Sequence, residues 1–134
     1  MAASIGAVWF NGDAVRNNIN KDLGFSISDR IEQAKRMGWL CDRVVEAGGI
    51  ALADFVCPTH ETREAFGEAY VIWVNRIQVS RYQDTNQIFI PPCHYDVEIN
   101  DKMSPTSALV AALKSWSKYN KRRHLELIQR YVKA

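Results

Sequence analysis

The stretch from residue 11 to residue 25, NGDAVRNNINKDLGF, brings acidic, basic and aromatic side chains together within a short length of chain. Asp13 and Arg16 lie near its start, Phe25 ends it, and Arg30 and Gln33 follow shortly after. Arginine binds phosphate or sulfate through its fork of N–H donors. An aromatic ring can stack on a planar base. These residue types therefore suit a ligand with a planar base and an anionic group. Surface pairing of both arginines with nearby carboxylates is an equally good interpretation at this point; the candidates are Asp13, Asp22 and Glu32.

The elements that must position these side chains alternate between strands and helices. Apolar runs stopped by turn residues predict three buried strands, at residues 5–10, 50–56 and 69–74. Apolar steps of three and four residues predict a helix over 29–47, and shorter helices are expected over 14–20 and about 60–65. This order predicts parallel pairing with right-handed crossovers. Asp13 then lies at the carboxyl end of the first strand, where open α/β sheets bind their ligands.

The remainder of the chain is less regular. Residues 76–95 are expected to lack helix and strand, with Pro91-Pro92 forcing extended backbone, and residues 97–99 could form a last short strand. Pro105 favours a helix over 104–118, followed by a basic helix over 121–132. We therefore expect one domain over residues 1–118 and a basic helical tail over residues 119–134.

The composition is that of an ordinary globular protein, with 47% hydrophobic and 24% charged residues in 134. A formal net charge of +2 is too small to argue for nucleic-acid binding, and the basic C-terminal residues fit a solvated helix face. Three cysteines without CxxC spacing suit reduced thiols in the cytoplasm. No apolar run approaches the roughly 20 residues that cross a bilayer, so no membrane partner is expected.

Several motifs in order resemble one enzyme family. The segments NGDAVRNNINKDLGFSISDRIEQAKR and EAGGIALADFVCPTHETR resemble the adenylylsulfate (APS) kinase pattern DGDNVRxxLNxDLGFSxxDRxENxRR, followed by an AG turn, a strand and SFISPxRxxR. The resemblance covers residues 8–74 and is weak beyond residue 76. It implies an α/β, P-loop-kinase-like domain with a parallel sheet in three layers. It also implies the reaction ATP + APS → PAPS + ADP, in which the γ-phosphate moves to the 3′-hydroxyl of APS.

The resemblance also assigns roles to individual residues. Asp13 matches the second aspartate of DGD and would act beside the reacting hydroxyl, as the catalytic residue. Arg16 and Arg30 match arginines that bind APS, and Phe25 matches the aromatic residue that packs on the adenine. Gln33 stands where the family has asparagine. The positions whose backbone groups contact the substrate are Val56 and Cys57. ATP and Mg²⁺ are implied for the full family enzyme, and neither is assured for this chain.

The chain also departs from the family pattern. Asn11 replaces the first aspartate of DGD, Asp54 replaces a serine, and residues 81–89 replace a longer basic lid. No GxxxxGK[ST] loop occurs, although this loop precedes DGD in the family and cradles the ATP phosphates. We therefore expect an N-terminally truncated fold in which residues 1–4 end a helix. Its sheet should have an open position near the middle, and these residues alone should be inactive or nearly so.

Other interpretations stay open beside this one. The chain could be a catalytically silent nucleotide-binding module, or a small kinase for a different acceptor, as Asn11 and the altered lid suggest. A zinc site is a weaker alternative, because the spacings match no usual pattern; its ligands would be Cys57, His60, Cys93 and His94. The tryptophans at 39, 73 and 116 are expected in the core. A homodimer is compatible with the sequence, which does not determine the oligomeric state.

Overall fold

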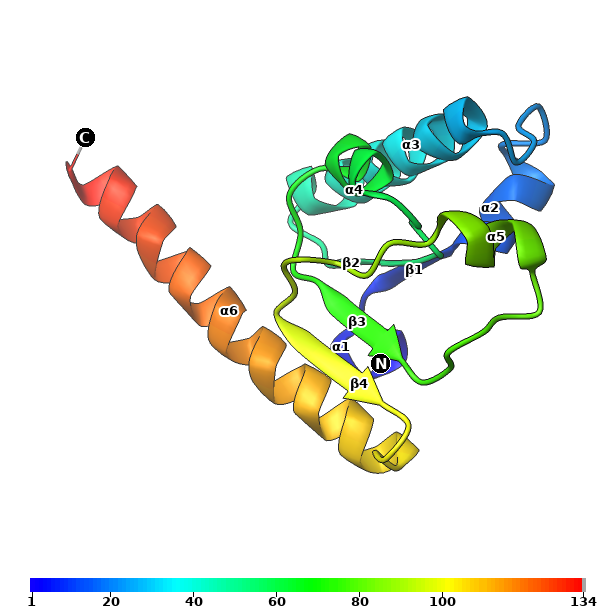
Figure 1. The fold of residues 1–134 in the computed structure, drawn as a ribbon. Coiled ribbons are helices and arrows are strands. Elements are labelled where there is room, and N and C mark those ends of the chain that lie inside the picture. Colours follow the sequence, from blue (N-terminus) through cyan, green and yellow to red (C-terminus); the bar gives the residue numbers. More distant parts are fainter. Residues whose placement is uncertain (134) are drawn as a thin grey trace. The chain divides into compact units, whose positions relative to one another are not determined.

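The computed structural model describes the backbone of residues 1–133 and the side chains of residues 1–2 and 5–121. Contacts group the chain into two compact units. Unit 1 comprises Met1–Glu68 and Arg81–Pro92, and unit 2 comprises Ala69–Ser80 and the chain from Cys93 onward. Each unit has one pair of parallel strands with helices beside it (Figure 1). The predicted α/β class and parallel pairing are confirmed.

The strand pair of unit 1 brings the carboxyl ends of two strands together. Strands β1 (Val8–Asn11) and β2 (Ala51–Asp54) run in register from Val8 opposite Ala51 to Asn11 opposite Asp54. Strand β1 starts later than predicted because residues 2–5 form a short helix, α1 (Ala2–Ile5), which Gly6 ends with a φ of 64°. The helical ending expected for residues 1–4 is thus present. The carboxyl ends of both strands lie at one edge, as parallel pairing requires.

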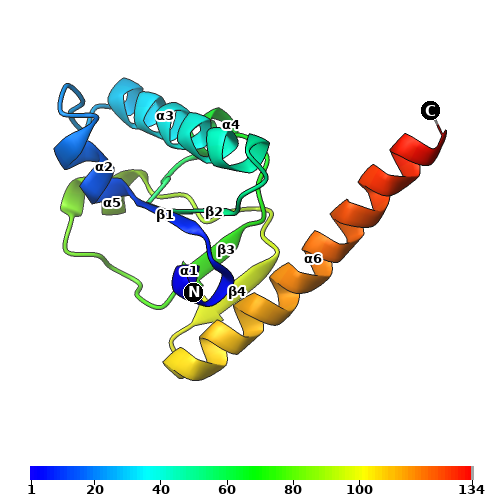
Figure 2. The same ribbon diagram turned by 180° about the vertical axis from the view of Figure 1, so that it is seen from behind.

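Two helices cover this strand pair on one side. Helices α3 (Ile27–Glu46) and α4 (His60–Phe66) lie on the same side of β1 and β2 in both views (Figures 1 and 2). The apolar stripe predicted for α3 is confirmed, since Ala34, Met37 and Cys41 are buried. Burial raises the pKa of the Cys41 thiol to about 11, which keeps it neutral in the core. This stripe attaches α3 to the rest of unit 1.

Side-chain caps define where both helices begin. The Ser26 hydroxyl accepts a hydrogen bond from the Asp29 amide at 3.1 Å, so α3 begins at Ile27, two residues before the predicted start. At the start of α4, Thr59 and Thr62 form a reciprocal capping box. These caps satisfy amide groups that no preceding helical turn could satisfy.

Glycine permits close packing between α3 and α4. A β-carbon at Gly38 would lie 2.1 Å from the carbonyl oxygen of Phe66, a distance that no folded structure tolerates. The backbone of α4 therefore approaches α3 at this position only because the side chain is absent. This contact determines how the two helices pack, and Phe66 also packs on Phe55 with ring centroids 5.6 Å apart.

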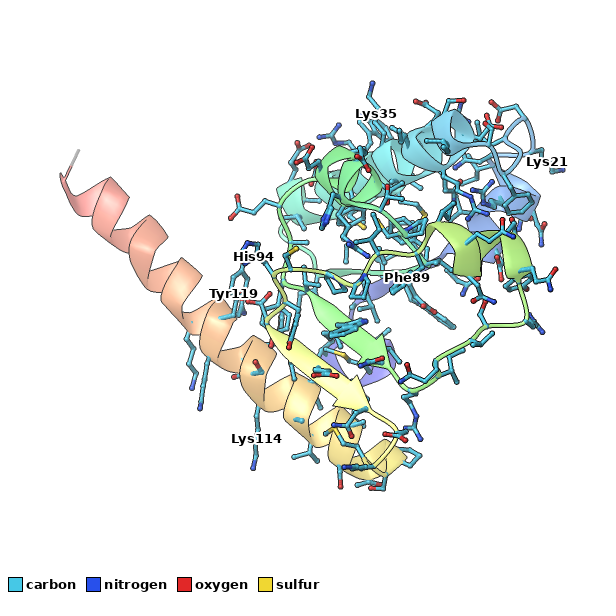
Figure 3. The ribbon with its side chains drawn as sticks, in the orientation of Figure 1. Lys21, Lys35, Phe89, His94, Lys114 and Tyr119 are labelled. Carbon is cyan, nitrogen blue, oxygen red and sulfur yellow. The ribbon has the colours of Figure 1, made fainter. Side chains whose placement is uncertain are left out.

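Unit 2 contains the other parallel pair and the long C-terminal helix. Strands β3 (Ile72–Asn75) and β4 (Val97–Asn100) pair with each other. Helix α6 (Pro105–Lys133) contacts β4. The Trp73 ring packs on Tyr95, and Tyr70 packs on Tyr119 of α6, both with centroids 5.1 Å apart. Figure 3 shows Lys114 on the opposite side of α6, pointing away from the strands. The described basic residues of this helix, Lys114, Lys118 and Lys121, are exposed, as expected for a solvated face.

Several details differ from the sequence predictions. Residues 83–88, expected to be irregular, form helix α5 (Gln83–Ile88). The two helices expected over 104–118 and 121–132 are one continuous helix, α6, and the side chains of the tail beyond residue 121 lie outside the described residues. The four described strands form two separate two-stranded sheets. None of the described helices is long and apolar enough to cross a membrane.

The prediction that Trp39 belongs to the core is wrong. Its side chain is 58% exposed, because position 39 lies about 200° around α3 from buried Met37. The Arg43 guanidinium covers its ring at 4.8 Å, and Arg43 also forms an ion pair with Glu46 one turn further along. We call Trp39 and Arg43 the Trp39 pair. Trp73 and Trp116 are half-buried.

Candidate functional site

The site begins where strand β1 turns directly into helix α2 (Gly12–Asn18). Asn11 caps this helix, its side-chain oxygen accepting a hydrogen bond from the Ala14 amide at 3.0 Å. Asp13 is exposed in the first turn, where a carboxylate interacts favourably with the helix dipole. A β-carbon at Gly12 would lie 2.6 Å from Cβ of Phe55, so glycine is needed for β2 to pass this close. Asp13 is therefore held by backbone geometry at the sheet edge predicted to bind ligand.

Two guanidinium groups converge on one exposed aromatic ring. Arg16 lies over the Phe25 ring at 4.6 Å from its centroid, and Arg30 lies at 5.4 Å. The Phe25 ring is 64% exposed, whereas Arg30 is only 8% exposed. Each arginine also donates to a backbone carbonyl, Arg16 to Gly24 at 2.7 Å and Arg30 to Phe25 at 3.0 Å. We call these three residues, which come from α2, the following loop and α3, the Phe25 cluster.

The electrostatics of the cluster favour an anion. Burial lowers the pKa of Arg16, and the neighbouring Arg30 guanidinium lowers it further, while Asp29 and Asp13 act in the opposite direction. The two guanidinium groups repel each other, and an anion close to both would relieve this repulsion; the Asp84 carboxylate already pairs with Arg30. The influence of Asp13 on Arg16 also shows that the predicted catalytic carboxylate lies within electrostatic reach of the cluster.

The loop between α2 and α3 is attached through Arg36. Its guanidinium donates to both carboxylate oxygens of Asp22, at 2.8 and 2.9 Å, and to Glu32 at 2.9 Å and the Asn20 side chain at 3.2 Å. The hydrogen bond from Arg36 lowers the pKa of Asp22. Lys35, the basic residue next to Arg36, points outward from α3 (Figure 3). Arg36 therefore holds the loop that carries Phe25, while Lys35 faces solvent.

These contacts bear on the surface-pairing alternative. Asp22 and Glu32, two of the carboxylates proposed as surface partners, both pair with Arg36. Arg30 pairs with a carboxylate that the sequence did not suggest, Asp84, at 2.7 Å. Among the described residues, the carboxylate that pairs with Arg30 is therefore Asp84 and not one of the three considered from the sequence.

Gln33 is buried and connects two of the segments that carry the site. The residue is buried, its Nε2 donates to the Gly12 carbonyl at 3.3 Å, and its Oε1 accepts from the Asn20 side chain at 2.8 Å. Both ends of the amide are therefore used inside the protein. The structure places Gln33 between the start of α2 and the loop that carries Phe25.

Two residues that depart from the family motif contact each other. Asn11 and Asp54 are opposite in the β1–β2 register, and the Asn11 Nδ2 donates to the Asp54 carboxylate at 3.3 Å. An aspartate at position 11 would place two carboxylates side by side at the same edge. Asparagine at position 11 avoids this repulsion and donates a hydrogen bond to Asp54 instead. The two residues are 43 positions apart, so the sequence alone does not predict the contact.

Val56 and Cys57 follow the end of β2. Cys57 has a φ of 46°, a left-handed conformation uncommon for a non-glycine residue, and burial raises the pKa of its thiol. The interactions known for the Cys57 thiol are with Thr62 and Arg63 of α4. Among the described residues, no hydrogen bond or ion pair joins Val56 or Cys57 to the Phe25 cluster. No group of three or more histidine, cysteine or acidic side chains that could hold a metal ion occurs in that described part of the chain, the proposed zinc ligands included.

Helix α5 adds residues that the sequence did not assign to the site. Arg30 Nη2 donates to the Asp84 carboxylate at 2.7 Å and lies 3.5 Å from the Thr85 hydroxyl, which is buried. Beyond α5, Arg63 donates to the Ile90 carbonyl and lies beside the Phe89 ring, labelled in Figure 3. An acidic residue in the first turn of a short polar helix was the only signal available for Asp84, and it is too weak to predict a contact with residue 30.

Comparison with known proteins identifies the family. The family model described as adenylylsulphate kinase matches residues 2–86, well over half of the 134 residues. The chain belongs to the adenylylsulfate kinase family. It is 44% identical over 55 residues to an adenylyl-sulfate kinase of Shewanella sp. (strain ANA-3), and 46% identical over 54 residues to that of Shewanella pealeana. These alignments cover 41% and 40% of this chain, and only 27% and 26% of the two relatives.

Solved structures of this family have the same fold. An APS kinase of Mycobacterium tuberculosis, CysC, in complex with AMPPNP and APS, superimposes with a TM-score of 0.72 at 17% identity. This match covers 86% of this chain and 82% of CysC. A mutant of the same kinase matches with a TM-score of 0.66 at 20% identity, covering 86% of this chain and 78% of the other. At these identities the likeness is one of fold, and it confirms the adenylylsulfate kinase fold predicted from the sequence motifs.

Proposed function

We propose that unit 1 binds adenylylsulfate, or a closely similar anionic adenine nucleotide, at the Phe25 cluster. The observation that carries this proposal is the exposed Phe25 ring with two guanidinium groups over it, at 4.6 and 5.4 Å. The ring would stack on the adenine, a contact worth about 1–3 kcal/mol for a base on an aromatic side chain. Arg16 and Arg30 would bind the phosphosulfate, and Asp13 would lie beside the hydroxyl that accepts a phosphoryl group.

The supporting roles follow from the contacts. Gln33 would act indirectly, through the Gly12 carbonyl and Asn20, and backbone groups at Val56 and Cys57 would contact the nucleotide from the end of β2. Magnesium is usually held by one or two carboxylates together with substrate phosphates, and Asp13 is an exposed carboxylate suited to that use. The cysteines support a cytoplasmic setting, where thiols stay reduced.

In the described part of the chain, no comparable group of residues supports binding of ATP, the phosphoryl donor. The 134 residues contain no GxxxxGK[ST] loop to cradle the phosphates of ATP. We therefore infer that these residues bind the acceptor nucleotide without transferring a phosphoryl group to it. The parent activity is adenylylsulfate kinase, a step in sulfate activation. A kinase for a different acceptor is the second candidate, favoured by the acidic helix α5 where the family has a basic lid.

Calorimetry with the 134-residue chain tests this proposal. We expect APS to bind more tightly than AMP, which lacks the sulfate, and adenosine to bind weakest. Phe25→Ala and Arg16→Ala should each weaken APS binding by roughly ten-fold. Arg43→Ala, which removes the guanidinium of the Trp39 pair, is the matched control and should leave it unchanged. Equal affinity for APS and adenosine, or equal losses in the Arg43 control, would reject the assignment. Incubation with ATP and APS should yield no PAPS.

A further inference from the structure

The segment that carries α5 is part of unit 1 and contacts the rest of that unit at two arginines. Near its start, Asp84 binds the Arg30 guanidinium at 2.7 Å. At its far end, the Ile90 amide donates to the Pro58 carbonyl at 2.8 Å, and Arg63 donates to the Ile90 carbonyl at 2.5 Å. The two attachments differ in chemistry, since the first is an ion pair with a side chain and the second uses backbone groups. An anion could therefore compete for the first attachment and leave the second in place.

The two partners in the ion pair have very different exposure. Arg30 is 8% exposed, whereas the Asp84 side chain is 60% exposed. A largely buried guanidinium left without an anion is strongly unfavourable, whereas an exposed carboxylate returns to water at little cost. Replacing Asp84 by another anion therefore costs less free energy than leaving Arg30 unpaired. Arg30 also lies beside the Phe25 ring, which is 64% exposed.

We propose that Asp84 is an internal anion that competes with the anionic group of the ligand for Arg30, and that binding of the ligand releases α5. This inference rests on the proposed function, because it takes Arg30 as a ligand-binding residue. Asp84 then acts as a specificity residue: a neutral ligand cannot displace it, whereas an anionic nucleotide can. The attachment at Ile90 keeps the released segment tethered to unit 1.

The test uses Asp84→Asn, which removes the charge and keeps the shape. Asp42→Asn is the matched control, because Asp42 is an exposed carboxylate on the same helix as Arg30, roughly 18 Å further along its axis. Calorimetry should show APS binding three- to ten-fold more tightly to Asp84→Asn than to the unmodified chain, with Asp42→Asn unchanged. Amide hydrogen exchange over residues 83–89 should accelerate when APS saturates the unmodified chain. In Asp84→Asn it should be fast before APS is added and change little afterwards.

Unchanged or weaker APS binding by Asp84→Asn would overturn the proposal, since Asp84 would then hold Arg30 in position for the ligand. Inorganic sulfate provides a readout that does not depend on the nucleotide. At constant ionic strength, sulfate in place of chloride should accelerate exchange over residues 83–89 in the unmodified chain and not in Asp84→Asn. If APS binds none of the proteins while sulfate has this effect, the proposed function fails and the competition at Arg30 stands. If neither anion changes the exchange, the competition itself is rejected.

Discussion

Unit 1 contains two arginine–aromatic contacts that look alike locally and differ in origin. The Phe25 ring and the Trp39 ring are similarly exposed, at 64% and 58%, and each has a guanidinium within 5 Å of its centroid. The Trp39 pair is built within one stretch of helix, with Glu46 as the additional partner of Arg43. The Phe25 cluster combines α2, the loop after it, α3 and α5. Exposure and an arginine contact are therefore insufficient to define a site; convergence of distant segments distinguishes the Phe25 cluster.

Disrupting the packing of α3 should have the largest effect and should separate the two contacts. In Gly38→Ala the added β-carbon meets the Phe66 carbonyl oxygen at 2.1 Å. Alanine improves helix propensity by only about 1 kcal/mol, whereas overpacking costs up to about 3 kcal/mol. We therefore expect a net loss of stability in urea unfolding and a weakened APS site. The Trp39–Arg43 contact should be retained, so the fluorescence of Trp39 should change little below the unfolding transition. Stabilisation by this substitution would show that α3 and α4 separate freely.

Removing Arg30 should have the next largest effect. Arg30→Ala deletes a charge-assisted contact, which is typically worth about 1.5–3 kcal/mol, so APS binding should weaken roughly ten-fold or more. Arg43→Ala removes the equivalent guanidinium from the Trp39 pair and should leave the affinity for APS unchanged. Calorimetry on folded variants, checked by circular dichroism, measures both. A similar loss in both variants would mean that the two contacts are functionally equivalent.

A smaller effect is expected at the end of the strand pair, where Asn11 meets Asp54. Aspartate caps a helix as well as asparagine does, so Asn11→Asp isolates the repulsion between two carboxylates. We expect a loss of about 0.5–1 kcal/mol in the free energy of unfolding at neutral pH. Adding Asp54→Asn should restore stability in the double variant. Equal stability of Asn11→Asp and the unmodified chain would show that the cross-strand contact carries no energy.

The smallest effect concerns the loop that carries Phe25. Because Arg36 lowers the pKa of Asp22, this pair stabilises the fold above the ordinary carboxylate pKa, and the stabilisation is lost as pH falls through the lowered value. In Arg36→Gln the pKa of Asp22 should return toward its ordinary value. NMR titration of the Asp22 carboxyl measures this directly. Arg43→Gln, which alters the Trp39 pair and the ion pair with Glu46, should leave the titration of Asp22 where it is.

Much of the scaffold could be predicted because its signals are local. The cap at Ser26, the stripe through Ala34 and Met37, and the turn after β1 each depend on residues a few positions apart, and all are present in the structure. The error at Trp39 came from its apolar side chain, since its position about 200° around the helix from Met37 places it away from the core. Helix α5 was missed because it has little intrinsic preference for helix, and its order comes with contacts to Arg30 and to the Pro58 region.

The sequence by itself determined the α/β class, the parallel pairing, the family and the residue types at the end of β1. Hydrophobic period, capping and spacing are properties of neighbouring residues, and they are legible without a structure. Only the tertiary structure decided which charges meet: Arg30 with Asp84, Asn11 with Asp54, and Arg36 with the loop before Phe25. Such pairs join positions far apart in the chain, and their energies depend on burial and distance, which no local pattern of residues encodes.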